Sequence, residues 1–170
     1  VIEPGARRAT DSRNRRIGVI GTEGTINSGR YEEAIRSLLP EAEVFTAACP
    51  LFVPLAEEGW AEHQVAELAG REYLRPLIAA QIDTLVLGCT HYPLLRKTLQ
   101  QVLGPEVRLV DSAEETARCV DDLFAEQGLA RPEHGGRRDF YVTDVPPRFE
   151  RVGRAFLGRE LGLVQQVQIG

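Results

Sequence analysis

A thiol, a hydroxyl and an imidazole occupy consecutive positions in this chain, at Cys89, Thr90 and His91. They follow the apolar residues 84–87 and a glycine, Gly88. In an open α/β fold, ligands bind just past the carboxyl ends of the buried strands. A thiolate at such a place can act as a nucleophile or as a general base. The stretch therefore predicts a reactive site centred on Cys89.

The neighbours of Cys89 decide between this interpretation and that of a small buried residue, which is the usual role of a single cysteine. Gly88 allows close approach to the backbone, and a helix beginning after the motif would offer free N–H groups to an anion. That helix terminus and the His91 imidazole would also favour the thiolate. A metal site is disfavoured, because Cys89 and His91 supply two ligands at most.

The remaining cysteines and histidines are expected to have structural or surface positions. Cys49 follows a predicted strand and could reach the same edge of the sheet, although core packing is favoured. Cys119 lies in a predicted helix at a core-facing spacing. His63 and His134 fall in predicted surface segments.

Two polar groups elsewhere could contribute to a site. Thr22 and Thr25 lie in a short loop after a predicted strand, in a stretch that lacks the lysine and spacing of a P-loop. Such a loop either binds a small anion or makes a tight turn. Glu57 and Glu58 follow the next predicted strand, and they are either part of the site or a solvated pair of charges.

The elements that would position these residues alternate between strand and helix. Strands are expected at residues 16–21, 44–47, 84–87 and 107–110, and helices at residues 28–39, 51–58, 65–80 and 94–103. Residues 1–15 are expected to be irregular because Pro4-Gly5 is a turn signal. Apolar strands that alternate with helices predict an α/β fold of Rossmann or flavodoxin-like type, with a parallel sheet flanked by helices.

One complete domain could close at residue 111, and residues 112–170 look less self-contained. This tail has a capping box at residues 112–115 that opens a helix to about residue 127. A loop rich in Gly and Arg, a strand at 140–143, a helix at 147–157 and a last strand at 163–169 follow. The predicted domains are therefore residues 1–111 and residues 112–170.

Composition excludes several classes of protein. A net charge of -5 argues against nucleic acid or an anionic membrane as the main partner, and no apolar run approaches a membrane span. Three unpaired cysteines fit a reducing, cytoplasmic location. The chain begins at Val1 and contains no methionine, which indicates a processed product or a fragment. The basic cluster is expected to be a solvated surface; it comprises Arg7, Arg8, Arg13, Arg15 and Arg16.

Residues 87–95 closely resemble the second cysteine motif of the aspartate/glutamate racemase family, and of its glutamate racemases in particular. Further similar stretches cover most of the chain: residues 1–6, 17–22, 48–51 with 53–54, 111–112 with 115–117, and 140–143. The resemblance implies a cofactor-independent, metal-free isomerase that interconverts L- and D-glutamate and supplies D-glutamate for peptidoglycan. It also implies that the partner is a small-molecule substrate and that a homodimer forms.

In this family two cysteines face each other across the substrate, one removing the α-proton and the other delivering a proton to the opposite face. Inversion needs an acid and a base on opposite sides, and the carbanion must be stabilised electrostatically. The resemblance implies that Cys89 deprotonates L-glutamate and that Thr90 and His91 bind substrate, with His91 also tuning Cys89. It implies that Glu57 orients the substrate ammonium or the histidine. Thr22 and Thr25 are weaker candidates for the substrate's surroundings.

Two features of the family are missing from the sequence: an Asp-Ser-Gly-x-Gly-Gly loop and a first cysteine within an Asn-Thr motif. Neither Cys49 nor Cys119 matches that motif. The chain therefore resembles the carboxyl-terminal two-thirds of the enzyme, inactive alone, with residues 112–170 returning to a missing first domain. Two alternatives stay open: a related racemase or isomerase acting on aspartate, hydantoin or a maleate-type acid, and a non-catalytic binding module.

Overall fold

A computed structural model describes residues 1–130 and 136–169; His134 lies outside these ranges. The chain divides into two compact units, Val1–Gly128 and Leu129–Gly170. The second unit contains β5 (Phe140–Val142), α8 (Pro146–Leu157) and β6 (Val164–Gln166), and its two strands pair in parallel. The last strand is thus shorter than residues 163–169.

The first unit contains a four-stranded parallel sheet in the order β2-β1-β3-β4. Its strands are β1 (Arg16–Gly21), β2 (Glu43–Ala48), β3 (Thr84–Leu87) and β4 (Arg108–Asp111). Its helices are α1 (Ile2–Ala9), α2 (Glu23–Asn27), α3 (Arg30–Leu38), α4 (Phe52–Glu57), α5 (Gln64–Ala79), the 3₁₀ helix η1 (Tyr92–Leu95), α6 (Arg96–Leu103) and α7 (Ser112–Glu126). The predicted α/β fold with a parallel sheet flanked by helices is confirmed.

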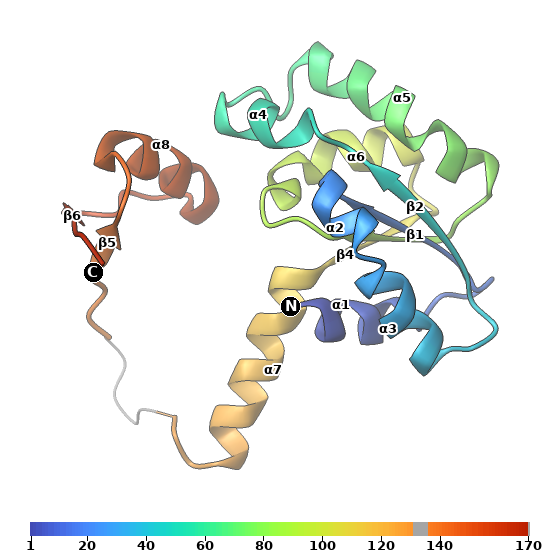
Figure 1. The fold of residues 1–170 in the computed structure, drawn as a ribbon, viewed down its shortest axis with the longest axis horizontal. Helices are drawn as coiled ribbons and strands as arrows, with labels where there is room; N and C mark the ends of the chain where they lie inside the picture. The colour runs from blue at the N-terminus through green and yellow to red at the C-terminus, as the bar shows by residue number, and fades with distance from the viewer. Residues whose placement is uncertain (131–135, 170) are drawn as a thin grey trace. The chain divides into compact units, whose positions relative to one another are not determined.

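The sheet is covered on both faces (Figure 1). Helices α4, α5 and α6 contribute to one apolar cluster, which includes Phe52, Leu74 and Leu99. Helices α1 and α3 contribute to the other, which includes Ala6 and Ile35. Because both faces are covered, all four residues of β3 are buried, as in other parallel sheets.

The expectation that residues 1–15 are irregular is wrong, because α1 spans Ile2–Ala9. Pro4 lies in the first turn of α1, where a backbone N–H has no intrahelical acceptor and its loss does no harm. Gly5 is buried against the start of α7: an added Cβ would lie 2.3 Å from the Ser112 hydroxyl oxygen. The Pro-Gly pair therefore reflects close packing of two helices and not a turn.

Two predicted helix starts also differ from the structure. Thr22 is the N-cap of α2, so the predicted polar loop is the first turn of a helix. Asp111, and not Ser112, caps α7: its carboxylate accepts from the amide of Ala113 at 2.9 Å and from that of Glu114 at 3.3 Å. A carboxylate satisfies the free N–H groups of a first turn, and Ser112 is instead buried.

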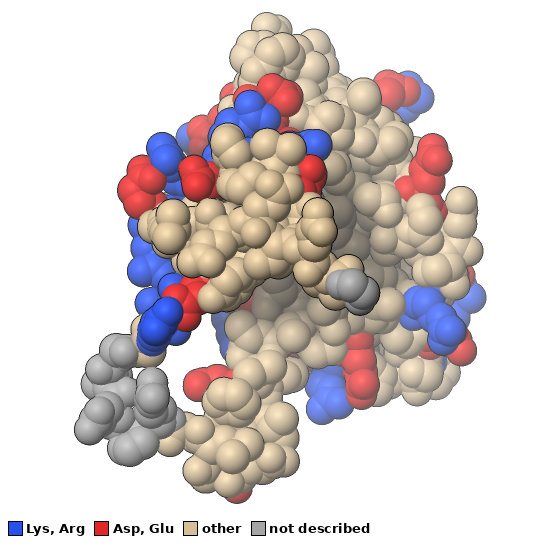
Figure 2. All heavy atoms as spheres, turned by 60° about the vertical axis from the view of Figure 1, so that its left-hand side comes forward, with Lys and Arg blue, Asp and Glu red and all other residues tan. Residues whose placement is uncertain are grey.

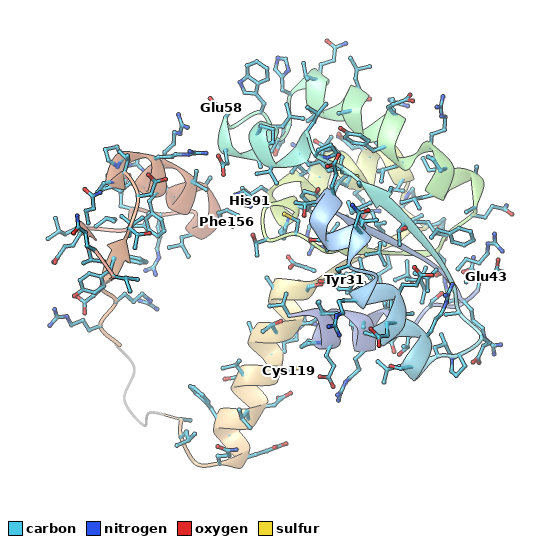
Figure 3. The ribbon with its side chains drawn as sticks, viewed as in Figure 1. Tyr31, Glu43, Glu58, His91, Cys119 and Phe156 are labelled. Carbon is cyan, nitrogen blue, oxygen red and sulfur yellow. The ribbon has the colours of Figure 1, made fainter. Side chains whose placement is uncertain are left out.

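Helix α7 belongs to the first compact unit, which ends at Gly128 and not at residue 111. The expectation that Cys119 faces a core is wrong for this chain, because Cys119 is exposed on α7 (Figure 3). Nearby apolar side chains of α7 are also exposed: Val120, Leu123 and Phe124. The assignment of residues 112–170 to a first domain stays a prediction.

Charged side chains of both signs are interspersed on the surface drawn in Figure 2. Each arginine of the basic cluster forms an ion pair with an acidic residue, for example Arg16 with Glu43 at 2.6 Å and Arg15 with Glu41 at 3.5 Å. The cluster is thus a charge-balanced surface. Within the described ranges, no helix has the length and apolar character needed to cross a membrane.

Candidate active site

The candidate site lies where the order of the strands reverses. Strand β1 is followed along the chain by β2 on one side of it, whereas β3 pairs on its other side. Ligands of open α/β sheets bind at the carboxyl ends of the strands that flank such a switch point. Ile20 of β1 pairs with Leu87 of β3, so Thr22 and Cys89 leave neighbouring strands at the same edge.

Gly88 fixes how the chain leaves β3. Its amide donates to the Ile20 carbonyl oxygen at 2.8 Å, which continues the ladder between β1 and β3 by one bond. An added Cβ would lie 2.7 Å from that oxygen and 3.0 Å from Cε2 of Tyr31. A side chain therefore does not fit here, and the close packing places the half-buried Cys89 directly past the strand.

His91 lies between a carboxylate and a hydroxyl. Its Nε2 is 3.2 Å from Oε1 of Glu57, and both side chains are about four-fifths shielded from solvent, with 23% and 20% exposed. Its Nδ1 is 3.3 Å from the hydroxyl oxygen of Thr90. Glu57 comes from the end of α4, which packs against η1 directly after His91. Both ring nitrogens of His91 thus have a polar neighbour, and the imidazole is held in one orientation two positions after Cys89 in the chain; His91 is labelled in Figure 3.

Thr22 and Thr25 form a separate pair of hydroxyls at the end of β1. Their hydroxyl oxygens are 3.0 Å apart, and the Thr25 amide donates to Thr22 at 3.3 Å. Gly21 allows this turn to fold tightly, since an added Cβ there would lie 2.9 Å from the Thr25 methyl carbon. The sequence left a small-anion site and a tight turn open, and the structure shows instead that Thr22 is a helix N-cap. A role of Thr22 and Thr25 toward substrate stays a prediction.

Cys49 is at the same edge of the sheet but is completely buried. Burial raises the pKa of its thiol to about 12, so it stays protonated at neutral pH. The neighbouring Tyr92 is also buried and donates to the Cys49 carbonyl oxygen at 2.8 Å. Burial, and then the nearby Cys49 and Cys89 thiols, raise the pKa of Tyr92. Core packing of Cys49 is therefore confirmed, and Tyr92 ties η1 to the end of β2.

Two residues at this edge were not assigned to the site from their sequence positions. Tyr31 was assigned to the apolar face of a helix, yet its hydroxyl donates to Ser112 at 3.0 Å. A tyrosine at a core-facing position is a signal in itself, because a buried hydroxyl needs a partner. Asp111 is the last residue of β4 and accepts from Arg96 at 3.3 Å. An acidic residue directly after a predicted strand was the available signal.

The described part of the chain contains no set of side chains that could bind a metal ion. There, no group of three or more His, Cys, Asp or Glu side chains is arranged to hold an ion. The polar groups that converge on the switch point are instead a thiol, an imidazole paired with a carboxylate, and several hydroxyls. This set suits proton transfer to and from a small polar molecule. The fold and site together define an open α/β domain with a cluster of polar, ionisable side chains at its topological switch point.

The chain belongs to the Asp/Glu/Hydantoin racemase family, whose model matches residues 1–120. It is 57% identical to a glutamate racemase of Geobacter metallireducens over 99% of its own length and 63% of that relative. Its fold matches a glutamate racemase of Bacillus anthracis with a TM-score of 0.89 and 34% identity, over 99% of this chain and 63% of that one. A glutamate racemase of Francisella tularensis in complex with D-glutamate matches with a TM-score of 0.88 and 32% identity, over 99% and 62%.

This chain therefore spans about 63% of the length of the curated relatives that it matches. Those relatives carry a further region, of about a third of their length, that has no counterpart here. Family membership follows directly from the match, whereas activity belongs to the whole protein.

Proposed function

We propose that this chain is the carboxyl-terminal part of a glutamate racemase, which interconverts L- and D-glutamate without a cofactor. The observation that carries the proposal is 57% identity with a glutamate racemase across 99% of the chain. The site adds physical support, because Cys89 follows the switch-point strand and the imidazole two positions later in the chain is oriented by Glu57. The supply of D-glutamate for peptidoglycan and a cytoplasmic, homodimeric protein belong to the same proposal.

In this mechanism the Cys89 thiolate removes the α-proton of L-glutamate from one face. The electron pair of the broken C–H bond stays on the α-carbon, and a second thiol then donates a proton to the opposite face. In the reverse direction, the thiol of Cys89 returns its proton to the carbanion. Because a carbanion forms without a cofactor to delocalise it, oriented donors and charges must stabilise it. Thr90, Thr22 and Thr25 are our candidates for hydroxyl contacts to the substrate.

Glu57 acts on His91 in this proposal, and not on the substrate ammonium. The 3.2 Å contact between the Glu57 carboxylate and the His91 ring supports this choice between the two roles. An imidazole held by a carboxylate on one nitrogen presents a defined tautomer at the other. His91 can then exchange a proton with Cys89 or with the substrate in a fixed geometry.

The second thiol has no source in this chain. Cys49 is completely buried, with a pKa of about 12, and Cys119 lies on α7, away from the strand ends. We propose that the missing third of the protein supplies it, and that residues 112–170 pack against that region. The exposed apolar side chains of both units support this arrangement; they include Leu123 and Phe124 of α7 and Tyr141, Phe149 and Phe156 of the second unit.

The test restores the missing region. The chain is fused behind the amino-terminal region of the Geobacter metallireducens relative, and this fusion is called the full-length hybrid. We expect the hybrid to form D-glutamate from L-glutamate and to leave L-aspartate unchanged, as measured by chiral chromatography. The 170-residue chain alone should form no D-glutamate. Sustained turnover by the purified chain alone, or a soluble, folded hybrid with no activity on glutamate, would contradict the proposal.

A further inference from the structure

A buried tyrosine, Tyr31, packs against the segment that contains Gly88 and Cys89, and the proposed chemistry gives it no role. Tyr31 comes from the first turn of α3 and is 4% exposed. Its ring lies against Gly88, since a Cβ added to that glycine would be 3.0 Å from Cε2 of the ring. Its hydroxyl extends toward the first turn of α7 and donates to Ser112 (Figure 3). Tyr31, which lies in the segment after β1, therefore contacts both the residue that follows β3 and the first residue of α7, which follows β4.

The acceptor at the far end of this contact is itself fixed. Ser112 is 2% exposed, and its hydroxyl oxygen is packed against Gly5 of α1, where an added Cβ would lie only 2.3 Å away. Asp111 holds the same turn of α7 by accepting from two of its amides. The hydroxyl of Tyr31 therefore donates to a group that cannot move without displacing α1 or α7.

The surroundings of Tyr31 also keep its hydroxyl protonated. Burial is the largest cause that raises the pKa of Tyr31, while the Ser112 hydrogen bond lowers it and nearby charge on Cys89 and Asp111 raises it further. The phenol is thus neutral at neutral pH and remains a hydrogen-bond donor.

We propose that Tyr31 is a positioning residue for Cys89, which holds Gly88 and the thiol after it in place through its hydrogen bond to Ser112. The inference rests on the proposed function, and it extends it to a residue that does not touch substrate. A thiol that takes a proton from carbon must approach it closely, and misplacement by about 1 Å can lower a rate by about 100-fold. A rigid support under Gly88 meets this requirement.

The first test uses the 170-residue chain and follows the Gly88 amide, which donates to Ile20, by hydrogen exchange. We expect Tyr31→Phe and Ser112→Ala each to accelerate exchange at Gly88 by about 10-fold, because each removes one partner of the same bond. The double variant should be no faster than the single ones. The matched control is Tyr73→Phe, a tyrosine on the other face of the sheet whose hydroxyl accepts from the Leu51 amide; exchange at Gly88 should be unchanged.

The second test measures turnover in the full-length hybrid. Tyr31→Phe should lower kcat by about 10-fold and leave KM within about twofold, because the substrate contacts remain while the thiol is misplaced. Unchanged exchange at Gly88 would overturn the proposal, as would equal acceleration throughout β1 and β4, which indicates general destabilisation. If the unmodified hybrid has no racemase activity, the proposed function fails, and exchange at Gly88 still decides the role of Tyr31.

Discussion

At the scale of single residues, short contacts fix the position of Cys89 and the orientation of the His91 ring. Cys89 is placed by Gly88, whose lack of a side chain allows the chain to lie against Ile20 and Tyr31. His91 is oriented by Glu57 at 3.2 Å. In the proposed mechanism the Cys89 thiol is the reacting group, and the surrounding residues determine where it lies and which ring nitrogen of His91 carries a proton.

Replacing Glu57 by glutamine tests whether this carboxylate acts by orienting His91. Glu57→Gln keeps the shape of the side chain but removes the charge that orients and stabilises the His91 ring. We expect kcat of the full-length hybrid to fall by about 10-fold to 100-fold, with a smaller change in KM. Steady-state kinetics in both directions of racemisation provides the measurement.

The control for Glu57 is its neighbour on the chain, Glu58, which is exposed after the end of α4. Glu58→Gln makes the same chemical change one position away and should leave kcat within about twofold. Equal losses for the two variants would show that negative charge near α4 matters in general, and that the contact with His91 does not.

At the scale of elements, the strands were predictable, whereas the starts of several helices were not. Each strand of the four-stranded sheet contains a short apolar run, and burial of the central strands β1 and β3 makes that pattern distinct. Helix α1 was missed because Pro4-Gly5 signals a turn locally, although packing against α7 favours a helix. The position of Cys89 was predictable for the same reason as the strands. A residue that comes directly after an apolar run must lie at the carboxyl end of the strand which that run forms.

The contact between His91 and Glu57 could be expected from the family resemblance but not from spacing, since the two residues lie 34 positions apart in the sequence. The support from Tyr31 was hidden for a related reason: helical spacing assigns a tyrosine to the core without naming its partner. Ser112, 81 positions away, becomes that partner only when β4 lies beside β3. Contacts of this kind depend on the order of strands in the sheet, which periodicity does not specify.

Asp83, directly before β3, binds the loop of residues 12–14 that precedes β1, and its ionisation tests how much this contact stabilises the fold. Its carboxylate accepts from the Ser12 hydroxyl and the Arg13 amide, both at 2.6 Å, and from the Asn14 amide at 2.8 Å. Burial alone would raise the pKa of Asp83, but these hydrogen bonds and one from Thr84 lower it overall. The folded state therefore favours the ionised carboxylate more than the unfolded chain does.

A lowered pKa in the folded state stabilises the protein above the unfolded pKa of about 3.9, and this contribution is lost as the pH falls through the folded value. We expect Asp83→Asn to lower the free energy of unfolding by about 1–3 kcal/mol at pH 7 and by less at about pH 3. Urea unfolding at both pH values measures this difference. Asp122→Asn, at an exposed position of α7, should have little effect at either pH; an Asp83→Asn effect that is equal at both pH values would contradict the argument.

At the scale of the whole molecule, the proposed mechanism needs two acid–base groups, and this chain would supply one of them. It spans about 63% of its curated relatives, and of its three cysteines only Cys89 is both accessible and at the carboxyl ends of the strands. The exposed apolar side chains on α7 and on the second unit are consistent with surfaces that a further region covers. Completion of the site and coverage of these surfaces are thus expected to occur together.

The most direct test of the central claim is the rate at which solvent deuterium enters the α-carbon of glutamate in the full-length hybrid. If Cys89 is the acid–base group on one face, Cys89→Ala should lower the rate of formation of α-deuterated D-glutamate from L-glutamate by at least about 1,000-fold. Cys119→Ala, the same change at an exposed position of α7, should leave it within about twofold. Deuterated D-glutamate formed by Cys89→Ala at a rate close to that of the unmodified hybrid would contradict the account.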